Sequence, residues 1–132
     1  MKKLYNASFT YLIIGLLSGI FAREYGKYKG ILGSTLLNLL HTHTLVLGFF
    51  FFLIALGLAK VFAFHEVKGF NNWFILHNIA LTLMLGSLAA RGLLQLNGAD
   101  FKWLTYIVGF SHSMMAFTLV WFMILLKKSS KM

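Results

Sequence analysis

The histidines are the first candidates for chemistry in this sequence, because four of the five lie inside long apolar runs. The four are His41, His43, His77 and His112. A charged side chain inside a membrane span costs about 3 kcal/mol or more, so an ionisable residue there marks a candidate functional site. Neutral imidazole is a common ligand of metal ions and of haem iron. The alternative is a structural role, in which each ring bonds to a backbone carbonyl or to a nearby Asn or Ser.

The other residue types narrow the chemistry to haem. The chain has no cysteine, which excludes thiolate metal sites, iron–sulfur clusters and covalently attached haem. Its three acidic residues, Glu24, Glu66 and Asp100, lie at the ends of the apolar runs. A proton channel is therefore disfavoured, and so is a bare zinc or copper site, which needs three or four converging ligands. Two imidazoles in an apolar setting suit the iron of haem b.

Depth in the membrane places three of the histidines in one layer. His41 and His43 lie about 9 and 12 Å from the boundary near Thr35, at a rise of about 1.5 Å per residue. His112 lies about 15 Å from Lys102, which marks the same side of the membrane. These three imidazoles therefore fall within about one helical turn of each other.

The two remaining histidines are expected to be structural. His77 enters the membrane from the opposite side, and with Asn78 beside it we expect a structural polar pair. His65 lies between two apolar runs, next to Glu66, and is expected at the surface.

His41 and His43 cannot both face the interior of one bundle. Two residues along a helix correspond to a rotation of about 200°. One of the two rings must therefore meet a partner outside that interior. We expect His41 and His43 to be axial ligands of haem iron, with His112 as the second ligand if the site lies within one protomer.

Two arginines are candidate partners for the haem propionates. Arg23 ends the first apolar run and Arg91 lies toward the end of the third, on the side of the histidine layer. Arg binds a carboxylate through two parallel hydrogen bonds, which Lys cannot do. The alternative roles are an ion pair between Arg23 and the adjacent Glu24, and interfacial anchoring by either arginine.

Four apolar segments are long enough to position these residues across a membrane. A spanning helix needs about 20 mostly apolar residues, and hydrophobic residues make up 59% of the 132 residues. The predicted spans are about residues 4–22, 36–59, 73–94 and 103–126. Their short connections predict an all-α, four-transmembrane-helix up-down bundle that forms a single domain, residues 1–132. In the first span, Gly15 and Gly19 are spaced for close helix packing.

The distribution of basic residues predicts the orientation. An even number of spans puts both termini on one side. That side collects Lys2, Lys3, Lys60, Lys68, Lys127, Lys128 and Lys131, and the other has Arg23, Lys27, Lys29, Arg91 and Lys102. Cytoplasmic loops carry the excess of Lys and Arg, so we expect a multi-pass protein of the bacterial cytoplasmic membrane with cytoplasmic termini.

One segment resembles a known haem-binding helix. The run Leu40-His41-Thr42-His43-Thr44-Leu45-Val46-Leu47-Gly48-Phe49 is similar to the second-helix haem-ligand segment of the catalytic subunits of heme-copper oxidases and nitric oxide reductases. The whole chain also resembles a family of small, uncharacterised four-helix bacterial membrane proteins. That second resemblance rests on residues 11–19, on Arg23-Glu24 and on the His41-x-His43 segment.

The oxidase resemblance implies an assembly and a ligand arrangement. Those subunits contain three pseudo-equivalent groups of four helices, which implies that this chain forms a homotrimer. A His-x-His segment in them ligates two haems on opposite sides of one helix. The resemblance thus implies a haem clamped by His41 of one protomer and His43 of the next. The chain lacks the His-His pair and the His-x-x-x-Tyr motif of the oxidase copper site, so oxygen reduction is not expected.

The expected function is haem b binding with cytochrome-like electron transfer, and a non-catalytic role is favoured over an enzyme. Two axial histidines leave iron no open position, which favours electron transfer. One displaceable ligand would instead allow gas sensing or haem handling. The competing class is a non-redox structural or transporter bundle, whose histidines only bond between helices. A quinone is one candidate redox partner, which the sequence leaves open.

Overall fold

The computed structural model describes residues 1–31, 35–99 and 101–130, and these residues form helices and short connections. Asp100 and Lys131 lie outside the described residues. The helices are α1 (Lys2–Tyr28), α2 (Leu36–His43), the π-helix η1 (Thr44–Phe50), α3 (Phe51–Phe62), the 3-10 helix η2 (Phe64–Glu66), α4 (Phe70–Leu96) and α5 (Lys102–Ser129). Because α2, η1 and α3 continue one another without a break, we call them together the second span.

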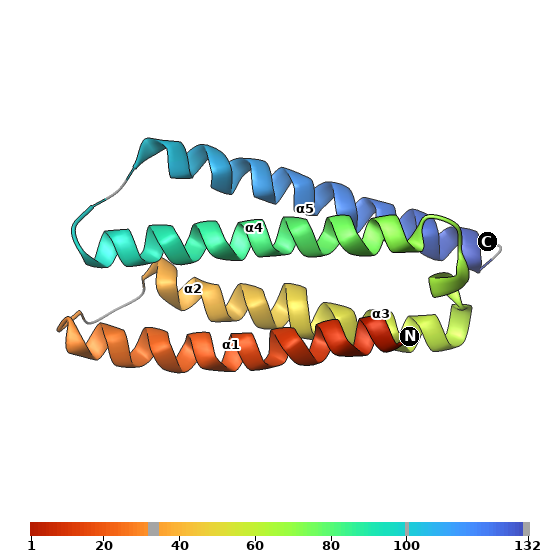
Figure 1. The fold of residues 1–132 in the computed structure, drawn as a ribbon, viewed down its shortest axis with the longest axis horizontal. Coiled ribbons are helices and arrows are strands. Elements are labelled where there is room, and N and C mark those ends of the chain that lie inside the picture. The colour runs from red at the N-terminus through yellow and green to blue at the C-terminus, as the bar shows by residue number, and fades with distance from the viewer. Residues whose placement is uncertain (32–34, 100, 131–132) are drawn as a thin grey trace.

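Four of these helical units are long and apolar enough to cross a membrane. The units α1, the second span and α4 have 27 residues each, and α5 has 28. They contain the four predicted segments and extend beyond both ends of each, except that the second span begins at the predicted residue, Leu36. Figure 1 shows that consecutive helices run antiparallel and that both termini lie at the same end of the molecule. The observed architecture is therefore an all-helical up-down arrangement.

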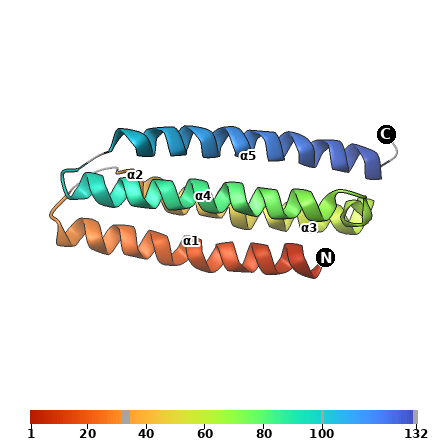
Figure 2. The same cartoon turned by 45° about the horizontal axis from the view of Figure 1, so that its top comes forward.

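The second span and α4 form the middle of the arrangement. The helix α1 packs against the second span, whereas α4 packs against both α5 and α2. Figure 2 shows α4 between α1 and α5, with the second span behind it. The two outer helices, α1 and α5, therefore each leave a broad face uncovered by the rest of the chain.

Close packing depends on glycines at two of these contacts. A Cβ atom at Gly15 would lie 2.7 Å from Leu45 Cδ2, and one at Gly92 would lie 2.9 Å from the backbone nitrogen of Leu37. At Gly92 the clash is with backbone, so only glycine lets these two helix backbones meet. At Gly15 the clash is with the end of the Leu45 side chain, which would have to shift to admit a larger residue.

A cluster of aromatic side chains fills the interior at the end where the termini lie. Its members are Phe51, Phe52, Phe64, Phe70, Trp73 and Phe122, which we call the aromatic cluster. Trp73 and Phe64 are fully buried, and the Trp73 indole nitrogen donates to the Thr118 carbonyl at 2.9 Å. The cluster holds the second span, α4 and α5 together at this end and so fixes the register of α5 against the other helices.

Candidate functional site

Two of the predicted histidines come together between the second span and α5. His43 is the last residue of α2, and His112 lies in α5. Their ring centres are 6.3 Å apart, and the ring planes meet at 75°. His43 is half-buried and His112 is exposed on the bundle surface. The structure thus pairs His43 with the residue that the sequence proposed as the second ligand within one protomer.

Each of the two rings is held by its own helix in the same way. His43 Nδ1 lies 2.8 Å from the Leu39 carbonyl oxygen, and His112 Nδ1 lies 2.7 Å from the Val108 carbonyl oxygen. A carbonyl oxygen only accepts, so each Nδ1 carries the proton and donates it. In the neutral rings Nε2 is then the nitrogen with the free lone pair. A ligating histidine is usually anchored in this manner, through the ring nitrogen that does not bind the metal.

The distance between the rings fits two imidazoles on opposite sides of one metal ion. A ring nitrogen lies ~1.1 Å from its ring centre and coordinates a metal at ~2.0 Å, so two opposed rings have centres ~6.2 Å apart. The observed 6.3 Å agrees with that separation. An edge-to-face ring pair with no ligand spans about 4.5 to 7 Å between centres, and it is the alternative account of the same distance.

The surroundings of the pair are apolar and open at the surface. On α5, Gly109 and Ala116 lie one turn to either side of His112, and both are exposed. A Cβ atom at Gly109 would meet no other atom within 4 Å. On the second span, Leu39 and Val46 flank His43 and expose 41% and 53% of their surface. A flat apolar group placed beside these rings would contact hydrocarbon on one side and small residues on the other.

His41 lies away from this pair. A Cβ atom at Gly19 of α1 would lie 3.4 Å from His41 Cγ, so the His41 ring rests against α1. His41 and His43 therefore face different helices, as their offset along α2 predicts. The Nδ1 atom of His41 is buried and has no hydrogen-bond partner among the described residues. The structure does not bring His41 together with His43 or His112 in one chain.

His77 is part of the aromatic interior. It is fully buried, its Nδ1 lies 3.0 Å from Thr118 Oγ1, and the ring stacks on Phe51 at 4.7 Å. The ring is therefore enclosed by side chains of the aromatic cluster. The predicted pairing of His77 with Asn78 is wrong, because neighbouring residues on a helix point to different faces. Asn78 instead accepts a hydrogen bond from the Tyr11 hydroxyl at 2.9 Å.

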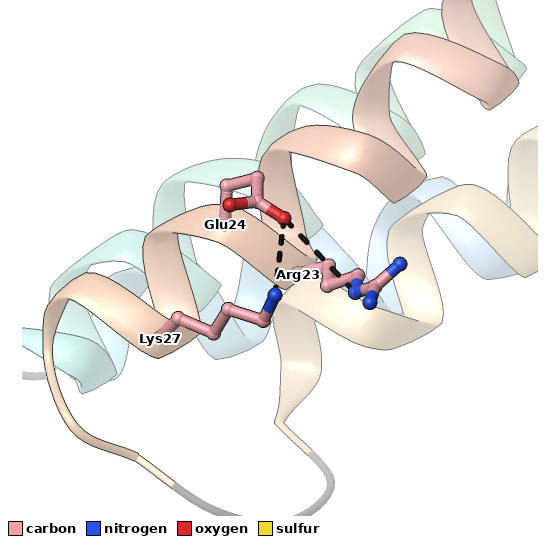
Figure 3. A network of polar contacts seen from close by, with 3 residues as sticks. All are labelled: Arg23, Glu24 and Lys27. Carbon is pink, nitrogen blue, oxygen red and sulfur yellow. Dashed lines mark ion pairs between the residues drawn. The ribbon is translucent and has the colours of Figure 1, made fainter.

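The two candidate arginines lie nearer the outer ends of the helices than the histidine pair. Arg23 is exposed, and its Nε lies 4.0 Å from Glu24 Oε1. The Lys27 ammonium lies 3.5 Å from the same oxygen, and Figure 3 shows the three side chains together. Exposed pairs of this kind contribute little to stability. Arg91 is half-buried on α4, beside the Gly92 contact with the start of α2.

Metal sites built from side chains alone are not seen in the parts of the chain that the structure describes. There, no three histidine, aspartate or glutamate side chains converge on one point.

The π-helix η1 was not predicted, and it begins directly after His43. Short π-helical stretches are rare and are frequent at functional sites. One local signal is Thr44, whose hydroxyl donates to the Leu40 carbonyl at 2.7 Å, a bond that bends helices. The wider turn changes the phase between α2 and α3. It thereby lets His43 face α5 while the aromatic cluster residues of α3 face inward.

Comparison with known proteins gives one match. A family model described as "Protein of unknown function (DUF2871)" matches residues 1–129. Neither the curated proteins nor the solved structures contain a match to the chain.

Proposed function

We propose that this chain, which belongs to the DUF2871 family of proteins of unknown function, is a haem b-binding electron-transfer protein of the cytoplasmic membrane. His43 and His112 are the proposed axial ligands. The observation that carries the proposal is their common geometry: ring centres 6.3 Å apart, with each Nδ1 bonded to a carbonyl of its own helix. We further propose cytoplasmic termini, since the end that holds them has the excess of Lys.

The matched anchoring favours ligation over a simple ring contact. An edge-to-face pair gains only about 0.5 to 1.5 kcal/mol beyond its buried area, and it needs no particular ring nitrogen. Here both rings use Nδ1 for the backbone and leave Nε2 as a lone-pair donor. A metal ion would use the lone pair of each Nε2 atom, whereas a ring contact would use neither.

His43 and His112 would hold the iron, and their anchored Nδ1 atoms would keep both imidazoles in the tautomer that leaves Nε2 free to ligate. Leu39 and Val46 would exclude water from one side of the group. Bound haem would supply a one-electron couple between ferric and ferrous iron. Two histidine ligands would keep small molecules from the metal, which favours electron transfer over gas chemistry.

An absorption spectrum tests the proposal. The purified protein in detergent is titrated with hemin, and we expect a Soret band with a low-spin spectrum that saturates at one haem per chain. Reduction with dithionite is expected to give the α and β bands of a six-coordinate b-type haem. A titration that gives only the spectrum of free hemin would contradict haem binding and favour the competing non-redox bundle.

A shared site in a homotrimer is a second candidate, and one observation favours it. His41 is half-exposed, and its buried Nδ1 lacks a hydrogen-bond partner among the described residues. A haem on this face would be clamped by His41 of one protomer and His43 of the next, with Arg23 near the propionates. Native mass spectrometry of the haem-loaded protein checks this arrangement, because a haem-loaded monomer rules it out.

A larger side chain at Gly109, at the open surface beside His112, is expected to reduce haem binding without disturbing the fold. A Gly109→Leu side chain would occupy space that no atom of the chain uses. It should therefore compete with the macrocycle and weaken hemin binding at least ~10-fold by steric exclusion. The matched control is Gly57→Leu, at another open glycine in α3, which should bind hemin as the original chain does. Equal loss in both variants would contradict a haem at this position.

A further inference from the structure

A long groove runs along α4 on the face opposite the second span. One part has a volume of about 670 Å³ and is lined by α4, Tyr11 of α1, and Leu104 and Ile107 of α5. A second part, of about 410 Å³, continues between α1 and α4 toward Lys3. The two parts meet at three shared polar residues, Tyr11, Asn78 and Thr82. Figure 2 shows this face, with α4 between α1 and α5.

The shared residues form a polar cluster in an apolar setting. The Tyr11 hydroxyl donates to Asn78 Oδ1 at 2.9 Å, and Asn78 Nδ2 donates to the Phe74 carbonyl at 2.8 Å. An amide nitrogen carries two hydrogens, so Asn78 keeps one donor for another acceptor. Thr82, an exposed residue, lies in the same cluster, and its side chain is hydrogen-bonded to Tyr11. The cluster thus offers uncharged hydrogen-bond donors, and no ionised side chain lines the larger part of the groove.

The position of the cluster limits the kind of ligand. Thr82 lies near the middle of α4, which places it near the centre of a membrane if α4 spans one. A polar group facing hydrocarbon at that depth is costly unless it has a partner. A phospholipid keeps its charged phosphate at the membrane surface, so its headgroup does not reach this level. An uncharged head with carbonyl oxygens can lie there.

We propose that the groove binds a neutral prenylated quinone from the membrane. Its carbonyl oxygen would accept from the free Nδ2 hydrogen of Asn78, beside the Tyr11–Thr82 hydrogen bond, and its apolar tail would lie against the exposed Ile79 and Leu83 of α4. The volume of about 670 Å³ is within the range of small-molecule pockets. The groove contains none of the histidines, so the proposal does not rest on haem binding.

Titration of the haem-free full chain in detergent with decylubiquinone tests the site. We expect saturable binding at one quinone per chain by calorimetry. Gly86 lines the groove, and a Cβ atom there meets nothing within 4 Å. Gly86→Leu should therefore fill the groove and weaken binding at least ten-fold, and Thr82→Val should weaken it three- to ten-fold. Gly57→Leu, away from the groove, should leave the affinity unchanged.

Three outcomes would contradict the quinone site. Unsaturable uptake, which is simple partitioning into the micelle, overturns the proposal. Equal affinities in the original chain, Gly86→Leu and Thr82→Val also overturn it. Displacement of the quinone by an equal concentration of phosphatidylglycerol would show a lipid site instead. A melting curve without quinone is recorded for each variant, and if Gly86→Leu is not folded, the near-isosteric Thr82→Val decides. A chain that binds quinone but stays colourless with hemin would refute the haem proposal alone.

Discussion

His112→Ala is expected to abolish the six-coordinate haem spectrum and to weaken hemin binding at least ~100-fold. Loss of a residue that only orients a ligand costs about 10- to 100-fold in metal affinity, and His112 is proposed as a ligand itself. The fold should survive, because His112 is exposed and its Nδ1 bonds to a carbonyl of its own helix. His43→Ala should have the same effect. Absorption titration with hemin measures both.

His41→Ala is the matched control for this prediction, because it separates the two possible sites. His41 and His43 belong to the same helix, but only His43 approaches His112. For a site within one chain, His41→Ala should keep the Soret band and His112→Ala should lose it. For a site shared between protomers the pattern reverses. Retention of the full spectrum by all three single variants would reject histidine ligation altogether.

Chemical rescue distinguishes a ligand from a structural residue. In His112→Ala, the space left by the ring lies at the surface and is open to small molecules. Millimolar imidazole should therefore restore the low-spin spectrum, because it can occupy the vacant coordination position. A histidine that served only to pack against His43 would give no such recovery. The comparison uses His43→Ala in parallel, whose half-buried ring position should be rescued less readily.

The spans could be predicted because membrane thickness sets the length of the apolar segments. The helices extend past the predicted limits, for example from residue 22 to Tyr28 in α1, since helical hydrogen bonding continues where the sequence turns polar. The opposite facing of His41 and His43 followed from helical rotation alone. Both features depend only on the rise and the rotation per residue of a helix, so they can be calculated from the spacing of residues in the sequence.

The choice of neighbours could not be predicted in the same way. Nothing local to His43 says that α5 rather than α1 lies beside it, because this depends on packing among all four helices. The π-helix η1 changes the phase of the second span, and within it Gly48 lies close against Tyr11 of another helix. The predicted His77–Asn78 pair failed because these adjacent residues face different helices.

Gly48→Ala is expected to destabilise the protein by about 2 to 4 kcal/mol, through overpacking and a strained interhelical hydrogen bond. A Cβ atom at Gly48 would lie 2.5 Å from both Cβ and Cγ of Tyr11. Tyr11 has little freedom to move, since its ring stacks on Phe52 at 5.8 Å and its hydroxyl bonds to Asn78. Either α1 moves away from η1 or the Tyr11 ring loses these contacts. Thermal unfolding in detergent measures the loss.

Two further variants locate the cause of that destabilisation. Gly57→Ala, at an open position in α3, should instead stabilise by up to ~1 kcal/mol, because alanine favours helix more than glycine does. Tyr11→Gly removes both the Cβ and the Cγ atom that a Gly48 methyl group would meet, so Gly48→Ala should cost little in that background. An equal cost of Gly48→Ala with and without Tyr11 would mean that the π-helix itself, and not the contact with α1, requires glycine. Because η1 begins at the residue after His43, that outcome would also make the glycine a determinant of how the histidine pair is oriented.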